Sequence, residues 1–469
     1  MHPTLQSKLQ KALQSREERL IRRRLPDPIS SKANPNSSEN LIDFTSNDYL
    51  SLTQSRILRD KFLQKLGDAP DILGSGGSRL LVNGQAHAAL EKRLADFFKS
   101  PIALLFNSGF DANVGFFGCI PQTGDAIVYD EYIHASVHDG MRGSRVSNDR
   151  RIAFRHNSVE DLRRVLVDLK RQMENQKPAT ETFSVFVAVE SLYSMDGTFS
   201  PLTEICDSLD QLFPAGNAYL VVDEAHSTGI YGPQGRGRVS QLGLEHRVLA
   251  RLVTFGKALG ATGAVVLTNE LVRDYLLNYA RPLIYTTSLS YSNIIAADAS
   301  FDLLTDGTAG QLSAKLQDLS TYFTSTLQQR LTVLQIPPKL LSLPQELRIQ
   351  LPALSPSPPD SSAAPAPASS ASIPPSPIIP LLTNHPRPLS AHLRSLDMNA
   401  RPITWPTVPK GKDRVRVCLH AGNTKSEIDK LIEGAVGWAV TLAERERRET
   451  LGGVGSSGQR SIVAFASKL

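Results

Sequence analysis

The sequence predicts an α/β protein whose core is a largely parallel sheet. From about residue 41 onward, short apolar runs alternate with stretches in which apolar residues recur at helical spacing. Strands buried on both faces read as continuous apolar runs, and the helices between them cover the sheet. Polar residues follow several of these runs, at the strand ends where open α/β sheets bind ligands. The 469 residues are enough for more than one domain.

The chain divides into four predicted parts. Residues 1–40 are expected to form an N-terminal helical arm and a connector rich in Pro, Ser and Asn. Residues 41–295 are expected to form a large domain, and residues 296–445 a smaller α/β domain. Residues 446–469 are expected to form a mobile tail. The strands expected in the large domain are "ALLF" (103–106), "AIVY" (126–129), "VFVAVE" (185–190), "YLVVD" (219–223) and "LVTF" (252–255).

One segment of the smaller domain is predicted not to fold. The stretch "PALSPSPPDSSAAPAPASSASIPPSP", residues 352–377, cannot bury a core, so we expect a disordered surface insertion there. The chain then resumes with a short strand around "RVRVCL" (414–419) and with the helical pattern "EIDKLIEGAVGWAVTLAERERR".

The composition disfavours several classes of protein. A total of 51 Lys and Arg against 46 Asp and Glu gives a net charge of +5, which is a weak argument for nucleic-acid binding. Anionic small molecules such as coenzyme A suit the same sign of charge. The cysteines Cys119, Cys206 and Cys418 lie far apart, which indicates neither a disulfide framework nor a metal site. No run approaches the length of a membrane span, and the N-terminus lacks the apolar core of a secretory signal.

Three of the predicted strands end in residues suited to one kind of chemistry. The run "LVTFGKALG" places Lys257 between small residues just past a strand, although lysine is rarely buried unless it is paired or chemically used. "YLVVDEAHSTG" places Asp223 and His226 past a second strand. "LLFNSGFDAN" places Gly109 past a third, at a helix start that suits a phosphate. Singly, each residue has an ordinary structural explanation, but together they converge on one edge of one sheet.

The segment "VDEAH" also resembles the metal-binding box of a helicase. Such an enzyme needs the phosphate-binding pattern G-x-x-x-x-G-K-[ST]. The nearest candidate is Gly256-Lys257, but Arg251 stands where the first glycine belongs and Ala258 where serine or threonine belongs. The sequence therefore argues against nucleotide hydrolysis.

A lysine, a carboxylate, a histidine and a phosphate-binding turn at one sheet edge meet the requirements of pyridoxal phosphate chemistry. The lysine amine forms an imine with the cofactor aldehyde, and the protein supplies orientation and electrostatics. A carboxylate beside the pyridine nitrogen favours the protonated ring, because an opposite charge raises the pKa of its partner. The pattern therefore predicts an enzyme that uses pyridoxal 5'-phosphate.

The sequence resembles the α-oxoamine synthases, which belong to the aminotransferase-like (fold type I) pyridoxal phosphate enzymes. The resemblance covers about residues 40–295 and resumes near 398–435. Within the family, "GATGAVVL" and "VRVCLHAGNT" are most similar to the member of the biotin pathway. The matching runs are "NDYLSL", "GSGGSRLLVNGQAHAALEKRLADFF", "NSGFDAN", "YIHASVHDG", "ESLYSMDGTFSPL", "VVDEAHSTGIYGPQGRG", "TFGKALG", "RPLIYTTSL" and "WPTVP".

The resemblance implies a role for each matching residue. Lys257 would bond to the cofactor and act as the base at Cα of the amino acid, Asp223 would pair with the ring nitrogen, and His226 would reach the phenolic oxygen. His134 would stack on the ring and assist proton delivery, and Ser194 would lie near the phenolic oxygen. The phosphate would be held by Gly109, Phe110 and Thr254, and from the partner subunit by Thr286 and Thr287. Asn47 would line the site across the dimer, and Arg401 would bind the substrate carboxylate, with Arg394 as the alternative.

The resemblance further implies a decarboxylative condensation of an amino acid with an acyl-coenzyme A in a homodimer. For the biotin-pathway member the substrates would be L-alanine and pimeloyl-coenzyme A. One alternative is glycine or serine with a different acyl-coenzyme A. A second is a catalytically inactive partner subunit, which should lack the lysine that stands at position 257. No metal, nucleic-acid or membrane partner is expected.

The last three residues, Ser467-Lys468-Leu469, match an address that the peroxisomal import receptor reads. We therefore expect a peroxisomal location, with the cytosol as the alternative. The insertion at 352–377 and the extra C-terminal tail are departures from the compact pattern of the family.

Overall fold

The computed structural model describes residues 2–25, 41–176, 183–348 and 374–452. The chain forms two compact units, residues 1–42 and residues 43–469. The first contains helix α1 (Pro3–Glu18), which begins with a proline in its first turn, where no intrahelical partner for the missing N–H is needed. The leucines predicted to share one face of this helix, Leu5, Leu9 and Leu13, are exposed.

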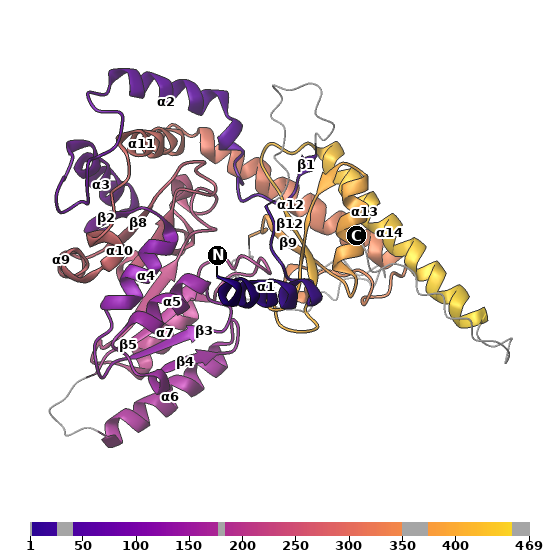
Figure 1. Cartoon of the computed structure of the whole chain (residues 1–469), viewed down its shortest axis with the longest axis horizontal. Coiled ribbons are helices and arrows are strands. Elements are labelled where there is room, and N and C mark those ends of the chain that lie inside the picture. The colour runs from indigo at the N-terminus through magenta and orange to yellow at the C-terminus, as the bar shows by residue number, and fades with distance from the viewer. Residues whose placement is uncertain (1, 26–40, 177–182, 349–373, 453–469) are drawn as a thin grey trace, which may run out of the picture. The chain divides into compact units, whose positions relative to one another are not determined.

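The second unit is built on a seven-stranded sheet with the order β2-β8-β7-β6-β5-β3-β4 (Figure 1). Only β8 runs antiparallel to its neighbours, so the predicted largely parallel sheet is confirmed. All five predicted strands are present, and the sequence reasoning missed two, β4 and β8. The strands are β2 (Ile102–Phe106), β3 (Ala126–Asp130), β4 (Arg151–Phe154), β5 (Val185–Glu190), β6 (Ala218–Asp223), β7 (Val248–Thr254) and β8 (Ala264–Thr268).

Both faces of the sheet are covered by helices, and each face has its own apolar core. Successive strand residues point to opposite faces, so Ile127 of β3 joins one core and Val128 joins the other. This double burial explains why the strands read as continuous apolar runs. One face is covered by α4 (Gly109–Cys119), α5 (Ala135–Gly143), α9 (Glu270–Tyr279) and α10 (Arg281–Ile284), and the other by α6 (Val159–Gln176), α7 (Leu202–Leu212) and α8 (Arg238–Gln241).

Further helices pack at the β2 edge of the sheet. Helix α3 (Gln85–Phe98) lies against β2, and α2 (Arg56–Asp68) lies against α11 (Tyr291–Thr305). Edge-to-face contacts join Phe97 and Phe98 to Phe301, with ring centroids 5.2 and 5.8 Å apart. Short 3-10 turns connect the elements: η1 (Leu52–Gln54), η2 (Asn148–Arg150), η3 (Pro233–Gly235), η4 (Glu245–Arg247) and η5 (Gln345–Leu347).

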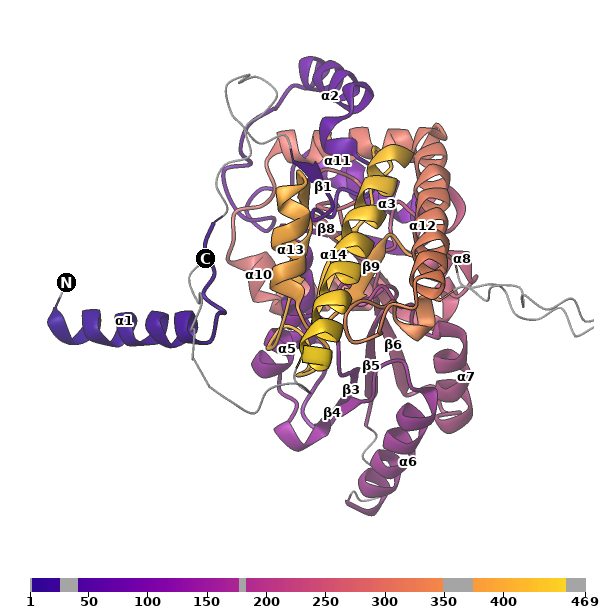
Figure 2. The ribbon, with the colours of Figure 1, turned by 90° about the vertical axis from the view of Figure 1, so that its right-hand side faces the viewer.

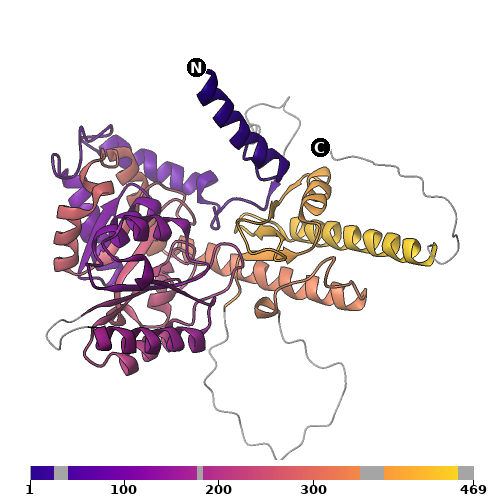
Figure 3. The same cartoon turned by 60° about the horizontal axis from the view of Figure 1, so that its bottom comes forward.

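A second, antiparallel sheet follows in the C-terminal part of the chain, with the order β11-β12-β9. Helices α13 and α14 lie side by side next to it, and α12 runs alongside α14 (Figures 2 and 3). These elements are α12 (Thr308–Val333), β9 (Ile378–Leu382), α13 (Pro386–Ser395), β11 (Arg401–Ile403), β12 (Arg414–Cys418) and α14 (Lys425–Gly452), and two short strands are β1 (Ile42–Asp43) and β10 (Met398–Asn399).

The structure locates the predicted boundaries without testing all of them. The expected division at 295 falls inside α11, so a continuous helix crosses it. Helix α14 runs to Gly452, past residue 446 where the tail was expected to begin. Residues 352–373 of the predicted insertion and the ending Ser467-Lys468-Leu469 lie outside the described residues. Among the described helices, none combines the length and the apolar character needed to span a membrane.

The loop from Tyr193 to Thr198 contacts the small sheet. Gly197 in this loop has φ +70°, and a Cβ atom placed there would lie 1.9 Å from the carbonyl oxygen of Ile378 in β9. Only glycine fits both the left-handed backbone and the contact. The small sheet therefore sits directly on the loop that carries Ser194.

We predict that Gly197→Ala destabilises the protein far more than Gly216→Ala. Gly216 has a similar φ of +74°, but a Cβ atom placed on it would meet no other atom within 4 Å. Gly216→Ala should therefore cost only the left-handed backbone energy, about 1 kcal/mol, whereas Gly197→Ala should cost on the order of 3 kcal/mol or more because the backbone must move. Chemical denaturation of both variants measures the difference, and equal losses would contradict the proposed contact.

Candidate active site

The candidate site lies at the carboxyl ends of β5, β6 and β7. The parallel register pairs Glu190 at the end of β5 with Asp223 at the end of β6. Lys257 follows β7 in the turn that leads back to β8. Strands of the same direction end at the same edge of a sheet, so the three side chains share one region. The convergence of Asp223 and Lys257 predicted from the sequence is thus present in the structure.

Burial and nearby charges shift the pKa of the Lys257 amine. Burial lowers the pKa of this amine, whereas the carboxylates of Asp223 and Glu190 act in the opposite direction, and the nearby Arg416 cation lowers the pKa further. Burial also raises the pKa of Glu190 well above its ordinary value. A lysine whose pKa is lowered spends more time as the neutral amine that acts as a nucleophile or a base.

Asp223 is nine-tenths buried and is held from two sides. Its Oδ1 accepts from the backbone N–H of Ala225, and its Oδ2 accepts from Nδ2 of Asn113 at 2.8 Å. Nδ2 of Asn113 also donates to Oγ of Ser136 at 3.0 Å, and this hydroxyl lies 2.7 Å from Nδ1 of His134. A chain of hydrogen bonds therefore runs from Asp223 to His134, which caps helix α5 and is exposed.

His226 is buried and neutral. Burial lowers the pKa of its imidazole well below the ordinary value, and the cations of Lys257 and Arg416 add to the effect. Its Nδ1 lies 2.7 Å from the hydroxyl of the fully buried Tyr49. That hydroxyl also donates to Oδ1 of Asn47 at 3.1 Å. Tyr49 thus fixes His226 and Asn47 relative to one another.

Arg416 of β12 reaches this group from the second sheet. Its Nη2 donates to Oδ1 of Asn47 at 3.0 Å, and its Nε donates to the backbone carbonyl of Ser194. The arginine is 7% exposed, and no carboxylate of the described residues forms an ion pair with it. A buried cation without a carboxylate partner is costly, so the geometry favours an incoming anion at this position.

Arg401, the residue assigned to the substrate carboxylate from the sequence, is placed differently. It lies in β11 directly opposite Arg416, so both side chains are on the same face of the small sheet. Unlike Arg416, it is exposed. Arg394, the alternative, is exposed in the last turn of α13. Of the three, Arg416 is the arginine that the described contacts connect to Asn47 and Ser194.

The proposed phosphate end of the site is the N-terminus of α4. Ser108 caps this helix, with its hydroxyl accepting from the N–H of Asp111 at 3.0 Å. A Cβ atom on Gly109 would lie 3.4 Å from Cβ of Thr254, so these two residues are adjacent. Phe110 is exposed, and its N–H is one of the first-turn donors without an intrahelical acceptor. Such a terminus suits a phosphate.

Thr286 and Thr287 were assigned to the phosphate of the partner subunit. In the single chain, Nδ2 of Asn107 donates to Oγ1 of Thr286 at 3.4 Å and to the carbonyl of Thr287 at 2.7 Å. Their role across a dimer, like that of Asn47, stays a prediction.

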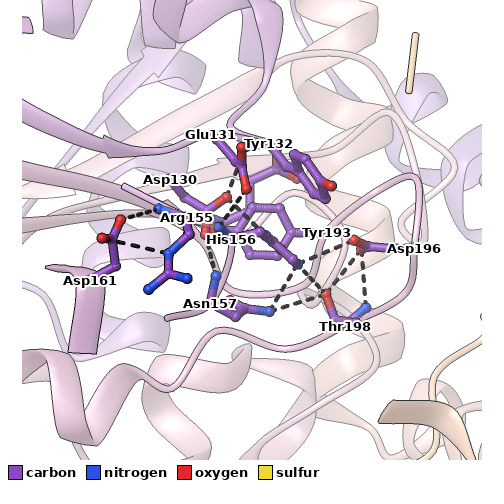
Figure 4. A network of polar contacts seen from close by, with 11 residues as sticks. Asp130, Glu131, Tyr132, Arg155, His156, Asn157, Asp161, Tyr193, Asp196 and Thr198 are labelled. Carbon is purple, nitrogen blue, oxygen red and sulfur yellow. Dashed lines mark hydrogen bonds and ion pairs between the residues drawn. The ribbon is translucent and has the colours of Figure 1, made fainter. Parts of the chain in front are cut away.

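A partly buried histidine that the sequence reasoning missed, His156, joins the two loops that carry His134 and Ser194 (Figure 4). Its Nδ1 lies 2.9 Å from Oδ1 of Asp130 at the end of β3. Its Nε2 lies 3.2 Å from Oδ2 of Asp196, in the loop after Ser194. Burial alone would lower the pKa of His156, but the hydrogen bonds to the two carboxylates raise it to about 9.

Two aromatic rings complete the surroundings of His156. The ring of Tyr132, two residues before His134, stacks on the imidazole with centroids 4.4 Å apart. The ring of Tyr193, next to Ser194, meets it edge-on at 4.5 Å. The imidazolium therefore ties both loops to the sheet, and it holds the side chains of Figure 4 in one cluster.

The residues of this site fit pyridoxal phosphate. They provide a partly desolvated amine, a carboxylate fixed by two donors, a neutral histidine, and a helix N-terminus with a close glycine–threonine contact. The amine would bond to the aldehyde, Asp223 would face the ring nitrogen, and the α4 terminus would receive the phosphate.

The comparisons with known proteins agree with this chemistry. Residues 39–357 match the family model described as aminotransferase class I and II. The chain belongs to this family of pyridoxal phosphate enzymes. An 8-amino-7-oxononanoate synthase of Emericella nidulans is 42% identical over 95% of this chain and 98% of its own length. This likeness places the chain among the acyltransferases of the family, as the α-oxoamine synthase resemblance implied.

Further relatives and solved structures carry both this name and others. The aminoacyl transferase sphA of Aspergillus fumigatus is 36% identical over 91% of this chain and 87% of its own length. Among solved structures, a serine palmitoyltransferase of Sphingomonas wittichii matches with a TM-score of 0.67 and 25% identity, covering 86% of this chain and 88% of that one. An 8-amino-7-oxononanoate synthase of Francisella tularensis matches with a TM-score of 0.62 and 25% identity over 87% and 99% of the two chains. The predicted aminotransferase-like fold is therefore confirmed.

Several residues of the site were inside recognised motifs but received no role from the sequence. Tyr49 lies in "NDYLSL", Asn113 in "NSGFDAN", Glu190 in "ESLYSMDG" and Arg416 in "VRVCLHAGNT". Tyr49, Asn113 and Arg416 contact residues far away in the sequence, and Glu190 acts on Lys257 through its charge, so no local signal could have assigned them.

We predict that the free energy of unfolding falls less at alkaline pH in His156→Gln than in the wild type. The pKa of His156 is raised from 6.5 to about 9, so its ion pairs stabilise the fold fully below about pH 6.5 and are lost as the pH rises through 9. The wild type should therefore lose about 3 kcal/mol more than the variant between these pH values. Thermal unfolding of the holoenzyme across this range provides the measurement.

The control is His138→Gln on helix α5. Burial lowers the pKa of His138, so this histidine is neutral throughout the range and its removal should leave the alkaline slope unchanged. Parallel profiles for the wild type and His156→Gln would show that His156 carries no charge in the folded protein.

Proposed function

We propose that the protein condenses L-alanine with pimeloyl-coenzyme A, giving 8-amino-7-oxononanoate, coenzyme A and carbon dioxide. The observation that carries the reaction class is the buried Arg416 beside Lys257, which offers an amino acid a carboxylate site next to a base. The choice of substrates is supported by the Emericella nidulans relative, which matches nearly the whole of both chains.

The residues of the chain would divide the work as follows. Arg416 and Asn47 bind the carboxylate of alanine, and this fixes the orientation of its Cα–H bond. The amine of Lys257 removes the Cα proton and later returns a proton to the product. Bound pyridoxal phosphate supplies a sink for the negative charge left at Cα. Asp223, held by Asn113, keeps that sink electron-poor through its charge.

Carbon–carbon bond formation then follows from the placement of the thioester. The alanine Cα attacks the thioester carbonyl, the bond to sulfur breaks, and coenzyme A leaves as the thiolate. The resulting β-keto acid loses its carboxylate as carbon dioxide, and Cα takes up a proton. His134 stands at the exposed rim with its Nδ1 held by Ser136, so its other nitrogen is the candidate to deliver a proton there.

A second candidate is the condensation of serine or glycine with a different acyl-coenzyme A. The aminoacyl transferase relative and the serine palmitoyltransferase structures favour it. Both candidates use the same residues for the amino acid and differ in the acyl chain. An inactive partner subunit is disfavoured because Lys257, Asp223 and His226 are all in place.

We predict that the release of coenzyme A is fastest with alanine and pimeloyl-coenzyme A. The assay combines alanine, glycine and serine with pimeloyl-, acetyl- and palmitoyl-coenzyme A, and the preferred pair should exceed the others by at least about tenfold in kcat/KM. Lys257→Ala should lower the rate roughly a thousandfold because the base is lost. Lys315→Ala, on the exposed surface of α12, is the matched control. A preference for palmitoyl-coenzyme A with serine would support the second candidate instead.

We also propose a peroxisomal location for the protein. The basis is the ending Ser467-Lys468-Leu469, which the import receptor reads as an address. Removal of these three residues should leave kcat/KM within about twofold, because address signals are not part of the fold. Fluorescence microscopy of the tagged wild type and truncated chains should show peroxisomal and cytosolic signals, respectively. An identical distribution of both would rule the address out.

A further inference from the structure

A cavity of about 330 Å³ lies between the Ser194 loop and the segment from Trp405 to Pro409. Its apolar wall includes Ile133, Met195 and Val408. Ser194 lines it and also accepts from Arg416 through its carbonyl, so the cavity adjoins the amino acid site. The lining is mixed, and its apolar part, next to the proposed amino acid site, suits the methylene chain of an acyl thioester.

Arg414 also lines this cavity, and it is 4% exposed. Its Nε donates to the carbonyl of Lys412 at 2.9 Å, and its Nη1 donates to the carbonyl of Met195 at 3.1 Å. Its Nη2 has no hydrogen-bond partner among the described residues and is not sealed off, so it is open to the cavity, and no carboxylate there forms an ion pair with the arginine. Removing a guanidinium from water without an anion is unfavourable, so the chain leaves a charge that an anionic ligand would complete.

Glu131 and Asp196 also line the cavity, but neither forms an ion pair with Arg414, and each is engaged by another group. Asp196 is engaged by the imidazolium of His156 and by the hydroxyl of Thr198, as Figure 4 shows. Glu131 is exposed, and its Oε1 accepts from the backbone N–H of His156 at 2.9 Å. Asp196 is therefore paired with His156. Burial lowers the pKa of Arg414, and this effect is larger than that of the charges of Asp196 and Asp413, which act to raise it.

Arg414 and Arg416 are alternate residues of β12, so their side chains point to the same face of the small sheet, roughly 7 Å apart along the strand. Both are buried cations without a carboxylate partner in the described chain. Arg416 is beside Lys257, where the amino acid binds, and Arg414 is at the cavity next to it. Two such cations call for two anionic groups on the substrates.

We propose that Arg414 binds the distal carboxylate of a dicarboxylic acyl thioester and thereby sets the acyl-chain specificity. This inference rests on the proposed condensation and names the feature of the acyl group that the site recognises. The apolar wall contacts the methylene chain, and Nη2 of Arg414 receives the carboxylate at its end. An acyl chain that ends in a methyl group would leave the guanidinium buried without an anion, and the site would discriminate against it.

The test compares two thioesters of equal chain length on the holoenzyme. One is pimeloyl-coenzyme A, and the other is its methyl ester, which lacks the terminal charge. With alanine, the wild type should prefer the acid by about tenfold or more in kcat/KM. Arg414→Gln should abolish this preference. Its kcat/KM for pimeloyl-coenzyme A should fall, while its kcat/KM for the methyl ester should stay within about threefold of the wild-type value. Arg414→Lys, which keeps a charge but not the fork, should show an intermediate preference.

The matched control is Lys410→Met. Lys410 is exposed and lies 5.4 Å from the ring centroid of Trp405, at the rim of the cavity. Its removal should preserve the preference, because an exposed cation is screened by solvent. An equal loss for both thioesters in Arg414→Gln would show that Arg414 only shapes the Met195 loop and would overturn the proposal.

A second measurement does not depend on any variant. Free pimelate should compete with pimeloyl-coenzyme A on the wild type at least about tenfold better than dimethyl pimelate, which carries no carboxylate, and equal inhibition would also overturn the proposal. The outcomes separate the two levels of inference. If pimeloyl thioester turns over and Arg414→Gln still discriminates, only the role of Arg414 is wrong. If the wild type accepts only long monocarboxylic chains, the proposed function itself is wrong.

Discussion

The site depends on the placement of one amine among charges at the edge of a parallel sheet. Burial lowers the pKa of Lys257, and Asp223 and Glu190 at the ends of neighbouring strands oppose that shift. The strand register brings the two carboxyl groups side by side. The amine is useful only because apolar residues on both faces make this sheet rigid and its strand ends converge. The rest of the site orients groups around this amine.

Residues from both sheets hold the groups around the amine in place. In the large sheet, Asn113 and Ser136 connect Asp223 to His134, and His156 ties the loops that carry His134 and Ser194. The small sheet contributes the buried arginines Arg414 and Arg416. Among these groups, His156 is paired with carboxylates inside the chain, whereas Arg414 and Arg416 are the cations to which we assign the anionic groups of the substrates.

Much of the fold could be predicted from local patterns, and less of the site. The apolar runs predicted the five core strands, and the polar residues after them located Lys257, Asp223 and His226. β4 was missed because its run "RIAF" is short and begins with a charged residue, and β8 because its run "AVVL" follows the loop of Lys257 closely. The sequence offered Arg401, with Arg394 as the alternative, and did not consider Arg416, because motif spacing does not reveal burial.

The sequence by itself determined the layer architecture, the chemical class of the site and the residues at the strand ends. The physical reason is that strand burial and strand-end polarity are local properties, written in runs of a few residues. Only the tertiary structure decided which arginine lies beside the amine, which partner fixes each carboxylate, and that Arg414 has no counter-ion in the described chain. Pairing and desolvation are set by side chains hundreds of residues apart, as between Asn47 and Arg416, and no local pattern encodes them.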